Sequence, residues 1–134
     1  MQTIAVFDLL SHATMHLPFN AGYIKVLLAA FPDDEIILFA DADHCENLKL
    51  ELAGENRVKF TPQAGIATGQ ENLHSPITGT KAAKRCFDSV TKQLGKKKLR
   101  LAAMSGADSN LLRVFRSKWG KFRALHYIIY YTIT

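Results

Sequence analysis

The stretch Thr3–Leu9, TIAVFDL, decides the fold class. It is a nearly continuous apolar run with β-branched and aromatic members, and its length suits one strand. Such runs are typical of strands that are buried on both faces of a parallel sheet. A second run with the same character, Glu35–Ala40 (EIILFA), follows it along the chain. The two runs predict two strands of a parallel sheet.

Apolar residues at spacings of three and four predict helices after these strands. We expect Asn20 to cap the first helix and Pro32 to end it, and Thr80 to cap a later one. The other expected elements are a helix over 44–52, a strand over 58–61, a helix over 81–94, a strand over 99–104, a helix over 111–119 and a β-prone run over 124–134. Alternating strands and helices predict an α/β fold, an open parallel sheet of about five strands with helices on both faces, which is a Rossmann-like arrangement.

Length and composition indicate a single domain over residues 1–134. The chain has 134 residues and is 48% apolar, which is the usual size and character of one domain. No apolar run approaches the roughly 20 residues of a membrane-spanning helix, and the first residues do not have the pattern of a leader. We therefore expect a cytoplasmic protein. Cys45 and Cys86 have no metal-type spacing and are expected to be free thiols, with no cofactor or metal implied.

Charge is distributed unevenly along the chain. Residues 1–80 contain 4 Lys/Arg and 10 Asp/Glu, whereas residues 81–123 contain 13 and 2. The second segment, with Trp119 among its basic residues, is compatible with contact to phosphates, nucleic acid or an anionic membrane surface. A solvated face explains the same pattern equally well. If this basic segment contacts an anionic membrane, the protein is peripheral at the membrane surface.

The segment Ser11–Gly22 is the loop most expected to face a ligand. It follows the first strand, and ligands of open α/β sheets bind beyond the carboxyl ends of the strands. Ser11 supplies a hydroxyl group, and Asn20 and Gly22 place backbone N–H groups and a positive helix end nearby, which suits an anion. The alternative is a polar loop with a good helix cap. Neither the dinucleotide pattern GxGxxG nor a P-loop is present.

His12 and His16 are the candidate catalytic residues of this loop. Imidazole changes charge near neutral pH, so either side chain could act as a general base, and the pair could also ligate a metal. Two histidines alone do not make a metal site, so we predict none. The alternative is an exposed or hydrogen-bonded loop histidine.

Polar residues also follow two other predicted strands. Asp41 could bind ribose hydroxyl groups, or it could hold a divalent ion together with Asp43. A solvated turn, with Asp43 capping the next helix, is the alternative. Ser105 lies in a polar turn after the fourth strand and could contact a ligand, although the turn lacks the G-x-S-x-G pattern of a nucleophilic serine.

The segment Ser11–Tyr23, SHATMHLPFNAGY, with the helix that it opens and the ending Ala30-Phe31-Pro32, resembles the opening of two-domain, B-type-fold glycosyltransferases. The similarity spans roughly residues 3–61. It implies an acceptor-side amino-terminal domain whose first loop faces the interdomain cleft, with His12, His16, Asn20 and Gly22 as the positions carried over. The implied partners are a sugar or lipid-linked acceptor and a donor-binding domain.

The chain departs from that family in one important respect. These enzymes bind the nucleotide sugar mainly through a second Rossmann-like domain, for which 134 residues leave no room. We therefore expect a fragment, an independent domain or one subunit of a split enzyme that does not transfer sugar alone. The alternatives are a stand-alone nucleotide- or phosphate-binding regulatory module and a basic nucleic-acid or membrane-surface adaptor. An uncovered strand run over 127–134 would favour a homo-oligomer.

Overall fold

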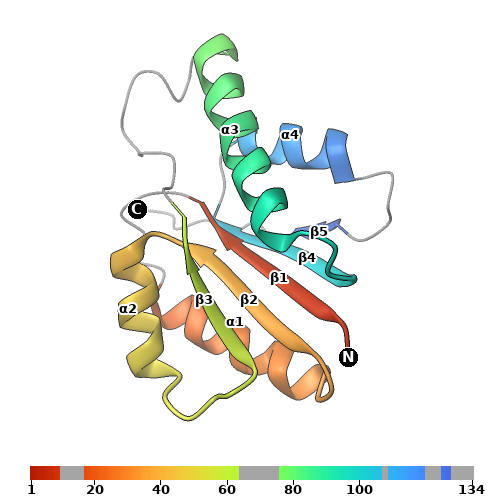
Figure 1. Ribbon diagram of the computed structural model, residues 1–134. Helices are drawn as coiled ribbons and strands as arrows, with labels where there is room; N and C mark the ends of the chain where they lie inside the picture. Colours follow the sequence, from red (N-terminus) through yellow and green to blue (C-terminus); the bar gives the residue numbers. More distant parts are fainter. Residues whose placement is uncertain (10–16, 64–75, 107–108, 120–124, 128–134) are drawn as a thin grey trace.

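The strands form one parallel sheet in the order β3-β2-β1-β4-β5 (Figure 1). The computed structural model describes residues 1–9, 17–63, 76–106, 109–119 and 125–127. Its elements are β1 (Thr3–Asp8), α1 (Leu17–Ala30), β2 (Glu35–Ala40), α2 (Ala42–Glu51), β3 (Val58–Pro62), α3 (Pro76–Leu94), β4 (Leu99–Gly106), α4 (Ser109–Trp119) and β5 (Leu125–Tyr127). The strands β1 to β4 carry the sheet, and β5 adds three residues at one edge.

Helices cover both faces of the sheet. Residues of α1 and α2 share one apolar core with β1 and β2, and residues of α3 and α4 share a second core with the opposite face (Figure 1). The predicted Rossmann-like α/β architecture is therefore confirmed. None of the helices in the described ranges is both long and apolar enough to cross a membrane.

The alternation of side chains along β1 assigns each residue to one of these cores. Ala5 and Phe7 belong to the core under α3 and α4, whereas Ile4 and Val6 belong to the core under α1 and α2. Phe7 stacks on Phe39 with ring centroids 5.3 Å apart. Because all these residues are buried, TIAVFDL is a central strand, as its composition predicts.

Several helices begin earlier than the sequence predicts. The first starts at Leu17, so Asn20 lies within its first turn and the prediction that Asn20 is the cap is wrong. The third starts at Pro76 rather than after Thr80, since proline is well tolerated in the first turn, where its missing N–H would have no partner. The fourth strand runs on to Gly106, so Ser105 belongs to β4 and not to a turn.

The amino edge of the sheet is held by a buried carboxylate. Glu35, the first residue of β2, is ion-paired with Lys97 at 2.6 Å and with Lys59 of β3 at 2.9 Å. Thr3 of β1 donates its hydroxyl to the same carboxylate at 2.9 Å. This cluster joins β1, β2, β3 and the segment before β4 at the edge opposite the candidate site.

Candidate functional site

Three buried polar side chains meet at the carboxyl end of β1. The Nδ2 atom of Asn20 in α1 donates to Asp8 Oδ2 at 2.7 Å and contacts His44 Nε2 in α2 at 2.8 Å. His44 Nε2 also lies 3.6 Å from Asp8 Oδ2. Their relative exposures are at most 1%, so the cluster is enclosed in the protein.

The contact between Asn20 and His44 has a defined direction as the side chains are placed. An amide nitrogen is only a donor, so His44 Nε2 is the acceptor of this hydrogen bond. The two hydrogens of the Asn20 amide are thereby directed at Asp8 and His44. The Oδ1 atom of Asn20 is buried and has no hydrogen-bond partner among the described residues.

Strand alternation places Asp8 in this cluster. Ile4 and Val6 face α1 and α2, and Asp8 follows them at the same spacing of two residues. An acidic residue at the end of an apolar strand, on the face covered by two helices, was a signal available in the sequence. Asp8 and His44 are not among the predicted site residues, because each lies within a predicted strand or helix.

Asn20 and Gly22 do not have the expected arrangement of free N–H groups. Because α1 begins at Leu17, Ala21 and Gly22 lie in its second turn, where backbone N–H groups bond to carbonyls of the preceding turn. The expected anion site on their N–H groups is therefore wrong. Gly22 is exposed on α1, and the space where a Cβ would lie is open.

Asp41 is the residue immediately before α2, although Asp43 was the predicted cap. Its side chain makes no capping hydrogen bond to α2, and Asp43 lies in the first turn of the helix. Asp41 is half-exposed at the carboxyl end of β2, next to β1 in the sheet. Within the described ranges, no three His, Cys, Asp or Glu side chains gather closely enough to hold a metal ion.

Ser105 is buried near the end of β4, on the other side of β1. Its hydroxyl donates to the Phe7 carbonyl at 3.4 Å, which joins the carboxyl ends of the two strands. Ser105 thus contributes to the structure of the edge and is not exposed to solvent. Ser11, His12 and His16 lie outside the described residues.

A second polar group joins α3 to α4. The Nη2 atom of Arg113 donates to Thr80 Oγ1 in α3 and, at 2.9 Å, to Asn110 Oδ1 in the first turn of α4. Arg113 is exposed, whereas Asn110 is buried. Since α4 follows β4 directly, this group lies on the side of the sheet that α3 and α4 cover, whereas the Asp8 cluster lies on the opposite side, with α1 and α2.

No family model and no curated protein sequence matches this chain. The chemistry of the site must therefore be inferred from its own residues. The described residues supply a carboxylate, an imidazole and an oriented amide on the side of the sheet covered by α1 and α2, and a guanidinium group on the opposite side, between α3 and α4.

The cysteines do not add a nucleophile to this site. Cys45 and Cys86 are both buried free thiols, as predicted. Burial raises the pKa of the Cys45 thiol to about 11, and its Sγ donates to the Ala40 carbonyl at 3.5 Å. Because the thiolate is the reactive form, Cys45 is inert at neutral pH.

Proposed function

We propose that the chain is the acceptor-side domain of a B-type-fold glycosyltransferase and that a separate donor-binding domain or subunit completes the enzyme. The strand order supports this proposal because it reverses between β1 and β4, which is where ligands of open α/β sheets bind. The acceptor is a sugar or a lipid-linked sugar, and it lies at the carboxyl edge beside these strands.

The Asp8–Asn20–His44 cluster is the observation that carries the proposal. It places hydrogen-bonding groups at the carboxyl end of β1, and Asn20 retains a buried acceptor atom, Oδ1, without a partner among the described residues. A hydroxyl group of a ligand or of the chain is a suitable donor for such an atom. The side chains of Asn20 and Ser105 are engaged within the protein, so their role is to position the edge.

In this proposal the first loop contributes the groups that contact the acceptor. His12 or His16 removes the proton from the attacking hydroxyl, Ser11 contacts the acceptor from the same loop, and Asp41 contributes from the end of β2. The His12→Ala and His16→Ala variants should each retain acceptor binding, while the variant that lacks the base should lose transfer in the assembled enzyme.

Calorimetry combined with a product assay tests the proposal. The chain alone should bind UDP-glucose only weakly, and it should release no glycosylated product from a panel of sugar acceptors. Tight binding of the nucleotide sugar together with turnover by the chain alone would overturn the proposal. The coding sequence beyond Thr134 offers an independent check, since a Rossmann-like half there would support it.

A stand-alone nucleotide-binding module is the second candidate. Asp41 favours it because it follows β2 directly and is half-exposed, which is where dinucleotide-binding folds place a carboxylate on the ribose hydroxyls. Native protein would then bind ATP or NAD, and Asp41→Ala would abolish that binding, while Asp43→Ala would leave it unchanged. Absence of binding to either nucleotide at millimolar concentration would eliminate this candidate.

We also infer self-association through the sheet. β5 is the terminal strand at one edge of the sheet, and edge strands present backbone groups that can pair with another chain. Light scattering at high protein concentration should then show a homo-oligomer. A monomer under those conditions would contradict the inference.

A further inference from the structure

The guanidinium group of Arg113 is oriented by two neutral side chains. Its Nη2 atom donates to Thr80 Oγ1 and to Asn110 Oδ1, and these bonds hold it between α3 and α4. The Nη1 and Nε groups have no hydrogen-bond partner among the described residues. Arg113 is exposed, so these remaining donors are open to solvent or to a ligand.

Two other arginines of the described chain, Arg57 and Arg100, have different partners. Arg57 directs its guanidinium at three backbone carbonyls, and Arg100 is paired with the Asp34 carboxylate. These two groups are therefore engaged in holding the fold. Arg113 has no carboxylate partner among the described residues, and its position is set by neutral neighbouring side chains.

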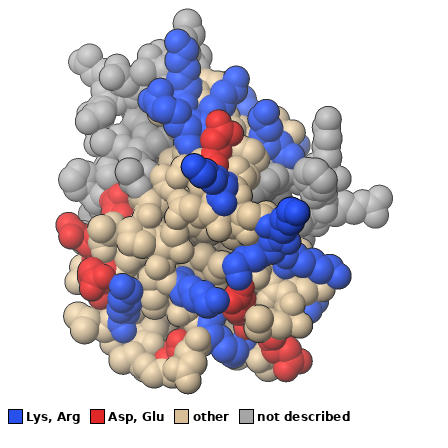
Figure 2. Space-filling view, viewed as in Figure 1, with Lys and Arg blue, Asp and Glu red and all other residues tan. Residues whose placement is uncertain are grey.

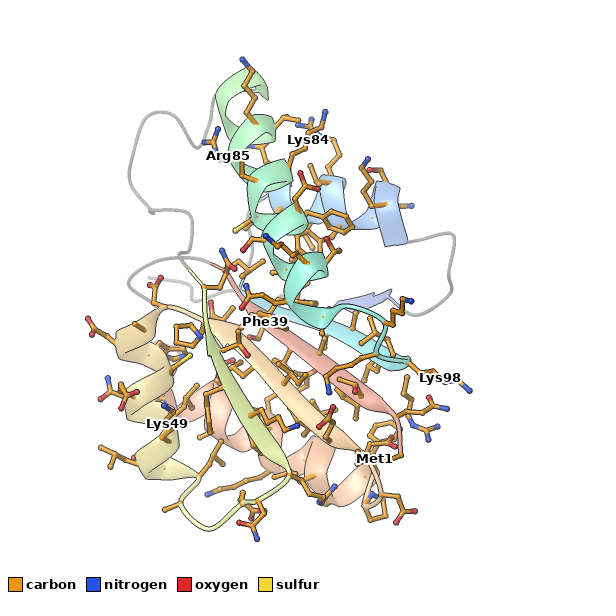
Figure 3. All side chains as sticks on the ribbon, viewed as in Figure 1. Met1, Phe39, Lys49, Lys84, Arg85 and Lys98 are labelled. Atoms are coloured by element: carbon orange, nitrogen blue, oxygen red, sulfur yellow. The ribbon has the colours of Figure 1, made fainter. Side chains whose placement is uncertain are left out.

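The surroundings of Arg113 are cationic. Lys84 lies one helical turn after Thr80 on α3, and Arg116 lies one turn after Arg113 on α4, and both are exposed. Figure 2 shows Lys and Arg side chains over the part of the molecule formed by α3 and α4, and Figure 3 shows Lys84 and Arg85 on α3. Asp88 is the one acidic residue in the described parts of residues 76–119.

We propose that Arg113, positioned by Thr80 and Asn110, binds a phosphate group of the ligand at the carboxyl edge beside β4. Guanidinium N–H groups form strong charge-assisted hydrogen bonds to phosphate oxygens, and a guanidinium that is already oriented loses less freedom on binding. The Nη1 group can donate to one or two oxygens of the phosphate. The proposal relies on the proposed function only in placing the ligand at this edge.

Calorimetric titration with inorganic phosphate and with glucose 1-phosphate tests this site in about 0.15 M NaCl, which screens unspecific attraction. Arg113→Gln should weaken binding of both probes at least about tenfold. Arg116→Gln is the matched control, because it removes the same charge from the same exposed face of α4, and it should change affinity less than about twofold. Thr80→Val keeps every charge and should weaken binding about threefold.

Two results would overturn the site. One is the absence of binding of either probe by native protein up to about 50 mM. The other is an equal loss of affinity in Arg113→Gln and Arg116→Gln, which would show that only net charge matters. Tighter binding of glucose 1-phosphate than of inorganic phosphate would identify a sugar phosphate as the source of the group.

Failure of this inference is distinguishable from failure of the proposed function. Arg113-dependent phosphate binding without any binding of sugar or UDP-glucose would refute the acceptor domain and leave the phosphate site standing. Sugar binding that is sensitive to His12 or His16, with no phosphate binding, would refute the phosphate site alone.

Discussion

Asn20 shows how the role of one residue depends on contacts that are distant in sequence. Its amide serves Asp8, 12 residues earlier, and His44, 24 residues later. A buried donor or acceptor that loses its partner costs about 1–3 kcal/mol, because it has also lost its hydration. Asn20 therefore stabilises two other polar groups besides itself.

Replacing Asn20 by alanine should lower the free energy of unfolding by about 2–3 kcal/mol, since both Asp8 Oδ2 and His44 Nε2 then lose a donor. Urea denaturation monitored by circular dichroism measures the change. Asn47→Ala, at a half-buried position on α2, is the control and should stay within about 0.5 kcal/mol of the native protein. Equal effects of the two substitutions would show that the cluster contributes no stability.

The carboxyl group of Glu35 should make the free energy of unfolding depend on pH. The lysines at its side, Lys97 first and then Lys59, lower the pKa of its carboxyl from the ordinary 4.5 to about 2. A lowered pKa in the folded state contributes stability that is present above pH 4.5 and is lost as the pH falls toward 2. Because both lysines are partly exposed to solvent, we expect a contribution of about 2 kcal/mol.

Denaturation curves recorded across this pH range provide the measurement. Glu35→Gln should be less stable than the native protein at pH 7 by about 2 kcal/mol, and the difference should shrink as the pH falls. Glu51→Gln, at an exposed position on α2, serves as the control and should follow the native curve. A constant difference between Glu35→Gln and native protein at every pH would contradict the assignment.

The start and the end of α1 are defined by different residues. Pro18 lies in its first turn, where a proline is well accommodated. At the other end, Arg57 donates to the carbonyls of Leu28 and Phe31 at 2.8 and 2.7 Å, and Pro32 follows. Side-chain donors on the last carbonyls complete hydrogen bonds that the helix itself cannot make.

Gly22 is a helical glycine that packing does not require. Its Cβ position is open, so Gly22→Ala should raise the free energy of unfolding by about 0.5–1 kcal/mol through helix propensity. Gly54→Ala is the opposing comparison, because the φ of Gly54 is +90° and alanine there is strained. Thermal denaturation should show the two substitutions shifting Tm in opposite directions, and destabilisation by Gly22→Ala would refute the open position.

At the scale of the whole molecule, charge is segregated between the two layers of helices. The exposed cations of α3 and α4 lie on one part of the molecule, and acidic residues gather around α2 (Figure 2). Such a surface attracts anionic partners through a field that weakens with salt. This arrangement keeps the prediction of an anionic membrane or nucleic-acid partner open to test.

Reversing two charges on α3 tests whether the exposed cations of α3 and α4 bind anionic membranes. Lys84→Glu with Arg85→Glu should abolish binding to anionic vesicles at low salt, if the native protein binds them. The pair Lys25→Glu with Lys49→Glu changes the net charge equally on α1 and α2 and should retain most of the binding. Co-sedimentation at rising NaCl concentration measures both, and binding that ignores salt or is absent would leave the prediction without support.

The parallel α/β architecture was predictable from the sequence because burial on both faces requires continuous apolar runs such as TIAVFDL and EIILFA. Helix starts were less predictable, since Asn20 is a common cap residue and yet lies inside α1, where Asp8 and His44 bind its amide. The local preference of a residue for helix caps does not predict a hydrogen-bond partner in another element. The alternation of strands and helices and the uneven distribution of charge follow from the sequence alone, because they depend on nearby residues and on composition. The meeting of Asp8, Asn20 and His44, and the orientation of Arg113 by Thr80 and Asn110, follow from strand order and helix packing, which bring together residues that are distant in the sequence.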